Sequence, residues 1–256
     1  DVIVGAILYN NRDGRAYIYY GGADMDSTPD VILDGELGAA SRFCYELSSG
    51  DINNDGYSDV LVGTNRYNNW TGRVYVYFGG LSMDSDPDVI FDGENEGDRL
   101  SFYNLSAGDV NNDGYDDVLV GAGLWNSLTG RVYVFYGSAS MDPFVDAALA
   151  DIVLDGENVG DMFGDSVSSG DINNDGYDDV IIAADEYNNA TGRVYVYHGG
   201  LSMDTMPDII LDGENEQNWF GIPTRLVGDV NGDGYNDVAI GGDHRVHIFF
   251  GPDFNQ

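Results

Sequence analysis

The chain has 256 residues and a formal net charge of −35, because 45 Asp and Glu residues are set against only 10 Arg and no Lys. Nucleic acids and anionic membrane surfaces are poor partners for such a chain, since both require clustered positive charge. No apolar run is long enough to span a bilayer, so direct membrane insertion is not expected. Cys44 is the only cysteine, which excludes an intrachain disulfide.

The chain opens on a short apolar segment, Asp1-Val-Ile-Val-Gly-Ala6, which has the pattern of a buried β-strand. The same pattern returns at Asp59-Val-Leu-Val-Gly-Thr64, where it follows an acidic loop. Because the first copy has no such loop before it, we expect the chain to be a processed or truncated piece of a longer protein.

The acidic loop is nine residues long and occurs four times, at intervals of 58, 62 and 58 residues, so the chain is a tandem repeat. Each copy has oxygen-bearing side chains at loop positions 1, 3, 5 and 9, Gly at position 6 and Tyr at position 7. Such oxygens, with a backbone carbonyl at position 7, are the ligands that Ca²⁺ prefers. We predict about four Ca²⁺ ions. Their ligands are Asp51, Asn53, Asp55, Tyr57 and Asp59; Asp109, Asn111, Asp113, Tyr115 and Asp117; Asp171, Asn173, Asp175, Tyr177 and Asp179; and Asp229, Asn231, Asp233, Tyr235 and Asp237.

Two other interpretations of the loop are weaker. An EF-hand loop begins in the same way but requires a bidentate Glu at position 12. That position is Val62, Val120, Ile182 or Ile240 here, inside an apolar strand, which rules against an EF-hand. The other alternative is a metal-free turn. A turn needs only one or two of these residues, so four copies with the same ligand spacing favour calcium.

Four short strands are predicted in each repeat. In the repeat that begins at residue 162 they cover 163–170, 179–184, 193–197 and 208–211, and we name them strands A, B, C and D. The units run approximately over 1–41, 42–99, 100–161, 162–219 and 220–256. The first unit lacks strand A and the last lacks strand D. A helical turn is expected only near Val145 to Ala150.

Strands B and C carry apolar residues on both faces, as Val132 and Val134 against Tyr133 and Phe135 show. Such strands must be covered on both sides. We therefore predict one all-β domain, a β-propeller of four-stranded blades that bury both faces against their neighbours. About five blade units, the first and last incomplete, are compatible with a five-bladed ring, with part of a larger ring, or with open ends completed by a neighbouring molecule.

The segment that contains Phe163-Gly164, Ser166-Val167, the loop Gly170 to Asp179 and the strand Gly192 to Tyr197 resembles the FG-GAP repeat. That repeat builds the N-terminal β-propeller of integrin α subunits and occurs in many secreted bacterial and archaeal proteins. The resemblance covers nearly the whole chain. It implies a propeller with Ca²⁺ in the A–B loops, an extracellular or cell-surface location, and a role in adhesion or as a scaffold.

The chain departs from the family pattern in two elements. Phe-Gly is kept at Phe163 and Phe220, but the second unit has Phe43-Cys44 and the third has Ser101-Phe102. The Gly-Ala-Pro element never contains Pro, as in Gly5-Ala6. Integrin propellers have seven blades, so the resemblance does not fix the number of blades here.

Two more features recur in the remaining loops. Aromatic and amide groups in the B–C loops suit carbohydrate or protein contacts, whereas repetition in each unit favours a structural role. The acidic groups of the D–A connections are expected to be turn and cap residues. The B–C loops carry Tyr9-Asn10-Asn11, Tyr67-Asn68-Asn69, Trp125-Asn126-Ser127 and Tyr187-Asn188-Asn189, and the D–A connections carry Asp34-Gly-Glu36, Asp92-Gly-Glu94, Asp155-Gly-Glu157 and Asp212-Gly-Glu214.

Three Asn-x-Ser/Thr sequences, at Asn69, Asn104 and Asn189, are candidates for glycosylation in a secreted protein. No phosphate-binding loop or Ser-His-Asp arrangement is evident, and no acidic pair breaks the repeat as a catalytic site would.

The sequence therefore predicts a non-catalytic, extracellular calcium-binding propeller for adhesion or structural assembly. A carbohydrate-binding module is the alternative, and a polysaccharide-acting enzyme domain a weaker one. The expected partners are a protein or glycan ligand at the cell surface, and further copies of the chain joined through the open terminal blades.

Overall fold

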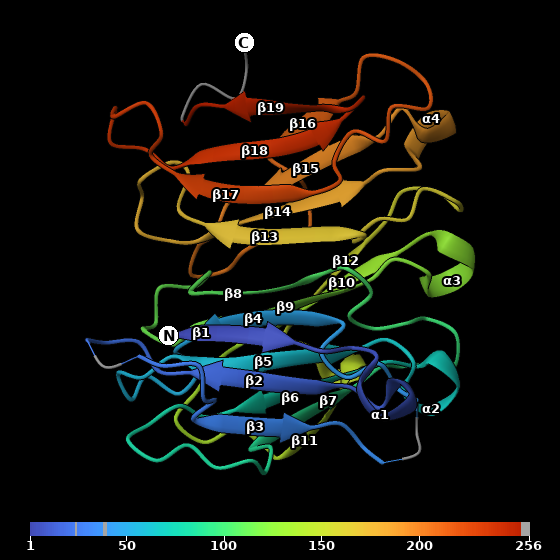
Figure 1. The fold of residues 1–256 in the computed structure, drawn as a ribbon. Coiled ribbons are helices and arrows are strands. Elements are labelled where there is room, and N and C mark those ends of the chain that lie inside the picture. The colour runs from blue at the N-terminus through green and yellow to red at the C-terminus, as the bar shows by residue number, and fades with distance from the viewer. Residues whose placement is uncertain (24, 38–39, 252–256) are drawn as a thin grey trace.

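A computed structural model describes residues 1–23, 25–37 and 40–251. Its regular structure is mostly β-strand, arranged in five sheets that follow one another along the chain (Figure 1). The last residues of the predicted fifth unit, 252–256, lie outside the described residues. No helix among the described residues is long and apolar enough to cross a membrane.

Within each sheet, strands that are consecutive in the chain pair in antiparallel register. The first sheet contains β1 (Val2–Gly5), β2 (Arg15–Tyr19) and β3 (Val31–Asp34). The second contains β4 (Glu46–Gly50), β5 (Asp59–Thr64), β6 (Arg73–Tyr77) and β7 (Val89–Asp92). The third contains β8 (Leu105–Gly108), β9 (Asp117–Ala122), β10 (Arg131–Phe135) and β12 (Ile152–Asp155). The fourth contains β13 (Ser166–Gly170), β14 (Asp179–Ala184), β15 (Arg193–Tyr197) and β16 (Ile209–Asp212), and the fifth β17 (Thr224–Gly228), β18 (Asp237–Gly242) and β19 (Arg245–Phe249).

The predicted strands B and C of the fourth unit coincide with β14 and β15, while strand A begins three residues later and strand D one residue later than predicted. The first sheet lacks strand A and the fifth lacks strand D among the described residues, as expected. The helical turn near Val145 is the 3₁₀ turn Ala147–Leu149. The B–C loops form four short turns: α1 (Tyr9–Arg12), α2 (Tyr67–Trp70), α3 (Trp125–Leu128) and α4 (Tyr187–Ala190).

One strand was not predicted. The C–D connection of the third unit contains β11 (Phe144–Asp146), which adds a fifth strand to the second sheet by pairing in parallel with β7. The backbone N–H of Ile90 donates to the carbonyl of Pro143 at 3.0 Å. This strand explains the longer interval between the second and third acidic loops, and it links two neighbouring units through the backbone.

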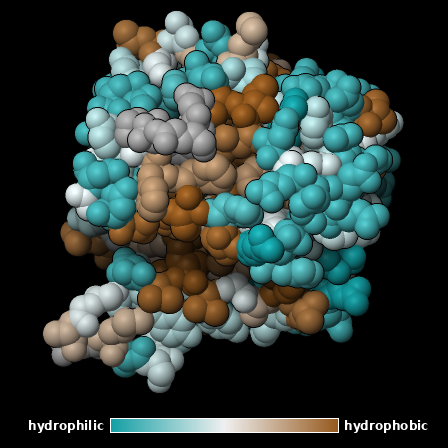
Figure 2. All heavy atoms as spheres, turned by 90° about the horizontal axis from the view of Figure 1, so that it is seen from above, coloured by the Kyte–Doolittle hydropathy of each residue, from teal (hydrophilic) through white to brown (hydrophobic). Residues whose placement is uncertain are grey.

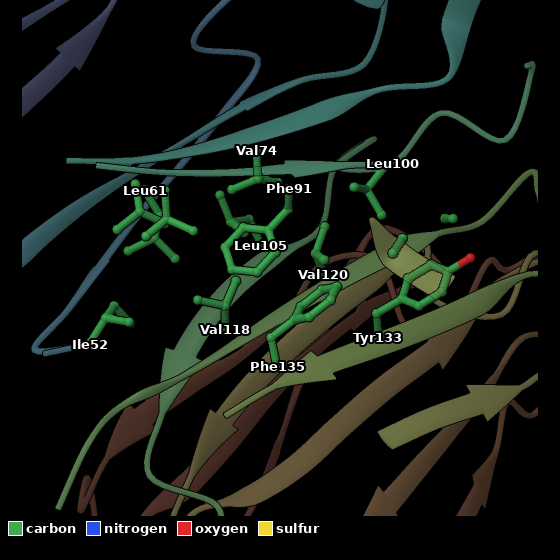
Figure 3. Close-up of a cluster of buried hydrophobic side chains, with 14 residues drawn as sticks. Ile52, Leu61, Val74, Phe91, Leu100, Leu105, Val118, Val120, Tyr133 and Phe135 are labelled. Atoms are coloured by element: carbon green, nitrogen blue, oxygen red, sulfur yellow. The ribbon is translucent and has the colours of Figure 1, made fainter. Parts of the chain in front are cut away.

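The core lies between the sheets, as strands with two apolar faces require. Each pair of neighbouring sheets encloses its own cluster of buried side chains. Figure 3 shows the cluster between the second and third sheets, where Phe91 meets Phe135 at 4.4 Å between ring centroids and Val118 and Val120 are fully buried. The burial of both faces of the inner sheets, which the sequence predicts, is therefore confirmed.

The first and fifth sheets each leave one face uncovered by other described residues. Val2 and Val4 of β1 are 46% and 47% exposed, and Val246 and Ile248 of β19 are 67% and 42% exposed. Figure 2, a view from above onto the end formed by the fifth sheet, shows apolar side chains beside hydrophilic ones. Both ends of the stack thus present apolar strands of the kind that the inner sheets bury.

In the second, third and fourth sheets, the arginine at the start of strand C connects neighbouring units. Arg131 of β10 forms two hydrogen bonds to Asp155 of β12, at 2.5 and 3.0 Å, and one to Glu94 of the preceding unit at 2.9 Å. Its guanidinium lies 3.7 Å from the ring centroid of Trp125 in α3. The equivalent arginines are Arg73 and Arg193, with Arg15 making the same contacts within its own unit.

These contacts correct one expectation. Apart from Glu214, the Asp and Glu residues of the Asp-Gly-Glu connections are partners of these arginines rather than turn and cap residues, as Asp92 and Glu36 show by both contacting Arg73. The reason is that strand D ends beside the start of strand C, which brings the carboxylates within reach of the arginine.

The substitution Arg131→Met tests this connection. It keeps the apolar stem but leaves Glu94 and Asp155 without their partner, so we expect the free energy of unfolding to fall by about 2 kcal/mol in urea denaturation. Arg245→Met is the matched control. The Arg245 side chain is 69% exposed, and its one ion pair, to Asp243, is long at 3.9 Å. The control should change stability by less than about 0.5 kcal/mol. Equal losses in both variants would contradict the connecting role of Arg131.

Candidate metal centre

The four acidic loops lie at the same end of the sheets. Each loop joins strand A to strand B, whereas α1 to α4 join strand B to strand C and lie at the opposite end (Figure 1). The loops and the aromatic-Asn turns therefore form two separate faces. We name them the loop face and the turn face.

The first loop is closed by its own side chains. Both Oδ1 of Asp51 and Oδ1 of Asn53 accept hydrogen bonds from the backbone N–H of Asp55, at 3.0 and 2.9 Å. The second oxygen of Asp51 accepts from the N–H of Gly56 at 2.9 Å, and Oδ1 of Asp55 accepts from that of Tyr57 at 2.9 Å. Gly56 takes φ +87°, which a residue with a side chain rarely adopts. The oxygens of positions 1 and 3 are thereby drawn to one point.

The carboxylate at position 9 lies deeper, at the base of the loop. Asp59 is fully buried, and its two oxygens accept from the backbone N–H groups of Ile52 and Gly79 at 2.8 and 2.7 Å. Burial is the largest effect on this group and raises its pKa to about 6. The same cause raises the pKa of Asp117 to about 7 and that of Asp179 to about 6. A buried carboxylate that resists ionisation is one that a nearby cation would stabilise.

The chemistry of this donor set fits Ca²⁺. All side-chain donors at positions 1, 3, 5 and 9 are hard oxygens, and the copies share the same hydrogen bonds, as Asp109 and Asn111 show by accepting from the N–H of Asp113. The described residues contain no group of three His, Cys, Asp or Glu side chains close enough to hold a metal ion. Position 3 is Asn, and the carboxylate at position 9 is turned toward backbone N–H groups, so the carboxylates alone do not converge.

Position 8 of the loop connects neighbouring loops, which the sequence did not reveal. In the second loop it is Asp116, whose carboxylate accepts from the N–H of Asp51 at 2.8 Å, while its own N–H donates to the carbonyl of Asp51 at 3.0 Å. Asp178 makes the same two contacts with Asp109 of the preceding loop. Asn236 donates from its side chain to the carbonyl of Asp171 at 2.8 Å. The four loops therefore form one hydrogen-bonded series.

Asp116→Ala should break the first link of this series. We expect the free energy of unfolding to fall by about 1 to 2 kcal/mol and the amide of Asp51 to exchange faster with solvent, because that N–H loses its acceptor. Hydrogen exchange followed by mass spectrometry measures the second effect. Ser58→Ala is the matched control, since Ser58 occupies position 8 of the first loop, which has no acidic loop before it in the chain. Exchange at Asp51 that is unchanged by Asp116→Ala would contradict the link.

On the turn face, the aromatic residues of the B–C loops have structural contacts. Their rings lie against the guanidinium groups of the strand C arginines at 3.6 to 4.0 Å, with Tyr67 over Arg73 as the nearest pair. The Asn residues that follow take left-handed backbone angles, for example φ +43° at Asn68 and +56° at Asn69. Asn is among the few residues that adopt this conformation readily, which explains its repetition.

The three glycosylation candidates have different environments. Asn69 and Asn189 are exposed, and each donates to a glutamate on the turn face, at 3.0 and 3.5 Å. Asn104 is 1% exposed and donates to the carbonyl of Gly164 in the next unit. A glycan has no room at Asn104 in the folded chain, so only the two exposed positions remain candidates.

In the third unit, the residue that takes the place of Phe163 is not in the Ser101-Phe102 pair that the sequence comparison puts there. Phe163 packs its backbone against Gly130 of the preceding unit, where φ is +84° and a side chain would clash. The residue in the same place against Gly72 is Leu100, not Phe102. One extra residue between Leu100 and β8 moves Phe102 to the turn face.

A buried carboxyl group also lies near the turn face. Asp165 is 5% exposed, and burial, followed by the charges of Asp185 and Glu186, raises its pKa to about 8. Its Oδ1 atom has no hydrogen-bond partner among the described residues. Asp165 therefore holds a proton at neutral pH that it would lose in the unfolded chain.

The substitution Asp165→Asn tests this shift. A carboxyl group with a higher pKa in the folded chain stabilises the fold at low pH relative to high pH, and that contribution is lost as the pH rises from its unfolded value near 4 to about 8. The variant should therefore raise the melting temperature at pH 8 and leave it nearly unchanged at pH 4. Asp142→Asn, at an exposed position, is the control. A variant with the same pH dependence as the parent chain would contradict the raised pKa.

Comparison with known proteins agrees with this geometry. The family model for the FG-GAP repeat matches residues 43–77, 101–135 and 163–197, and each stretch contains one acidic loop with the strands on either side. Integrin alpha-5 of Xenopus laevis is 31% identical over 216 residues, covering 78% of this chain and 20% of that protein. Integrin alpha-4 of Xenopus laevis is 30% identical over 230 residues (82% and 20%), and human integrin alpha-6 is 31% identical over 223 residues (84% and 18%).

The sheets, the loops and these matches define a protein built of FG-GAP repeats. The chain belongs to the integrin-like FG-GAP repeat family. It spans about one fifth of the length of the relatives described above.

Proposed function

We propose that the chain is an extracellular, calcium-binding β-propeller module that serves adhesion or structural assembly and has no catalytic role. The observation that supports this most directly is the series of four acidic loops on one face, each with the same oxygen-bearing residues and each linked to the next. Its similarity to integrin α subunits supports the assignment to an extracellular adhesion module.

Calcium would be held by side chains at positions 1, 3, 5 and 9 and the carbonyl at position 7 of each loop. When bound, the ion supplies positive charge that offsets the repulsion among carboxylates such as Asp51, Asp55 and Asp59. The residues of this chain do the rest. Backbone N–H groups within each loop hold the oxygens together. The residue at position 8 forms hydrogen bonds to the backbone of the preceding loop and so fixes the two loops relative to each other. Extracellular calcium is abundant enough to fill sites of weak individual affinity.

The two end sheets support a role in assembly. Their exposed apolar strands match those that the inner sheets bury, so further blades or further copies of the chain would complete them. The structure gives the carbohydrate-binding alternative less support, because the aromatic rings of the turn face are already stacked on arginines.

The first test is calcium titration of the chelator-treated chain by calorimetry, together with thermal melting. We expect about four ions per chain and a higher melting temperature with calcium, because only the folded loops bring the ligands together. Asp113→Ala should remove one site. Asp142→Ala, at an exposed position of the same unit, should remove none. A chain that binds no calcium would overturn the metal assignment.

Light scattering on the same samples tests the role. A monomer in calcium supports a self-contained binding module, and reversible growth into polymers supports a structural subunit joined through its end sheets. For the second outcome, Val246→Asp and Ile248→Asp in β19 should abolish growth, because they place charge on the exposed apolar face. Hydrolysis of a polysaccharide by the purified chain would contradict the non-catalytic role.

A further inference from the structure

Four of the ten arginines, namely Arg12, Arg42, Arg66 and Arg99, gather on the turn face of the first two units. We name them the arginine cluster. They come from two B–C turns and from two D–A connections. None of the four forms an ion pair within the part of the chain that the structure describes, in contrast to the five arginines that begin strand C. In a chain of net charge −35, this is an unusual concentration of positive charge.

Aromatic rings hold the cluster together. The guanidinium groups of Arg66 and Arg99 lie 4.2 and 4.1 Å from the ring centroid of Trp70, so both charges share one indole. Arg99 also lies 5.3 Å from Phe102. The ring of Phe102 stacks on Tyr45 at 5.5 Å, with 8° between the two planes. The extra residue of the third unit, which brings Phe102 to this face, therefore contributes directly to the cluster.

Arg42 and Arg12 extend the cluster toward the first unit. The guanidinium of Arg42 lies 5.7 Å from Tyr45, and its backbone N–H donates to the carbonyl of Arg12 at 2.9 Å. The Nε atoms of Arg42 and Arg66 are buried and have no hydrogen-bond partner among the described residues. The same holds for both polar atoms of the fully buried Asn65 side chain. Buried polar atoms without partners are rare, and the Nε–H groups of Arg42 and Arg66 each lack an acceptor.

The arrangement is unfavourable for the chain alone. Burial, and then the positive charges of the other three arginines, lowers the pKa of Arg66. Asp98, the neighbour of Arg99 in the sequence, accepts a hydrogen bond from the side-chain amide of Asn95 at 2.9 Å. Groups of like charge with no compensating partner are found mainly at functional sites, where a ligand of opposite charge binds.

The chemistry of the cluster selects an anionic ligand of limited length. Guanidinium groups recognise carboxylates by paired hydrogen bonds, and the stacked rings hold them in place for that purpose. A long polyanion, such as a sulfated polysaccharide, would run beyond the cluster onto a strongly acidic surface and be repelled. A short segment with a few adjacent carboxylates would stay within the cluster.

We propose that the arginine cluster is a docking site for a short acidic peptide segment of a partner chain, whose carboxylates pair with Arg66 and Arg99. The cluster lies on the opposite face from the acidic loops. The site therefore stands whether or not those loops bind calcium.

Fluorescence anisotropy with a dye-labelled tetra-aspartate peptide tests this site on the intact chain. At low ionic strength we expect saturable binding that weakens with added salt. Arg66→Gln and Arg99→Gln should each weaken binding by about tenfold or more, because each removes a charge-assisted pair of hydrogen bonds. Arg245→Gln removes the same charge from an exposed site outside the cluster and should leave affinity within about twofold.

A folding control keeps the test decisive. Arg12 is exposed and makes no contact with the rings of the cluster among the described residues, so Arg12→Gln should fold normally and still weaken binding severalfold. Circular dichroism and thermal melting verify the fold of each variant. Absence of binding, or equal binding by the Arg66 and Arg245 variants, would overturn the proposal. So would tighter binding of heparin than of the peptide, since heparin is a long sulfated polyanion.

Discussion

Every part of this fold depends on strands B and C being apolar on both faces. A sheet of that kind is most stable with both faces covered, so the three inner units depend on a neighbour on each side and the two end units on the one neighbour that covers them. Polar contacts at both ends of the sheets then fix how the units meet. On the turn face Arg131 joins its own Asp155 to Glu94 of the unit before it, and on the loop face Asp116 holds the backbone of Asp51. Hydrophobic burial thus supplies the driving force for stacking, and these two sets of hydrogen bonds supply its register.

The features that could be predicted from the sequence are those with a local signal. Strands B and C of the fourth unit were located to the residue, because β-branched and aromatic residues run between a position 9 Asp and a Gly-rich turn. The acidic loops were recognisable because their ligand spacing repeats. The loop geometry adds what spacing alone could not give, namely that the carboxylate of Asp59 is buried at the base and bonded to two backbone N–H groups.

The features that were missed all depend on contacts between units, which leave no local pattern. Asp116 looks like any acidic loop residue, and only the stacking brings it to Asp51, 65 residues earlier. Asn104 and Asn69 lie in the same Asn-x-Ser/Thr pattern. Stacking of the units nevertheless buries Asn104, whereas Asn69 remains exposed. The arginine cluster is likewise invisible in the sequence, since its members come from four separate connections. Leu100 shows the same limit, because its equivalence to Phe163 is defined by the glycine it packs against.

The strand β11 gives the stack an uneven resistance to force. Most neighbouring sheets are joined by side-chain contacts and by single hydrogen bonds, such as that from the N–H of Leu226 to Ser168, and these bonds separate one at a time when the sheets are pulled apart. Between the second and third units, β11 and β7 also share a parallel ladder, whose hydrogen bonds resist a shearing force together. The outermost sheets, each covered on one side by described residues, would peel away first. A tension applied along the chain would therefore leave the second and third units as the last pair to separate.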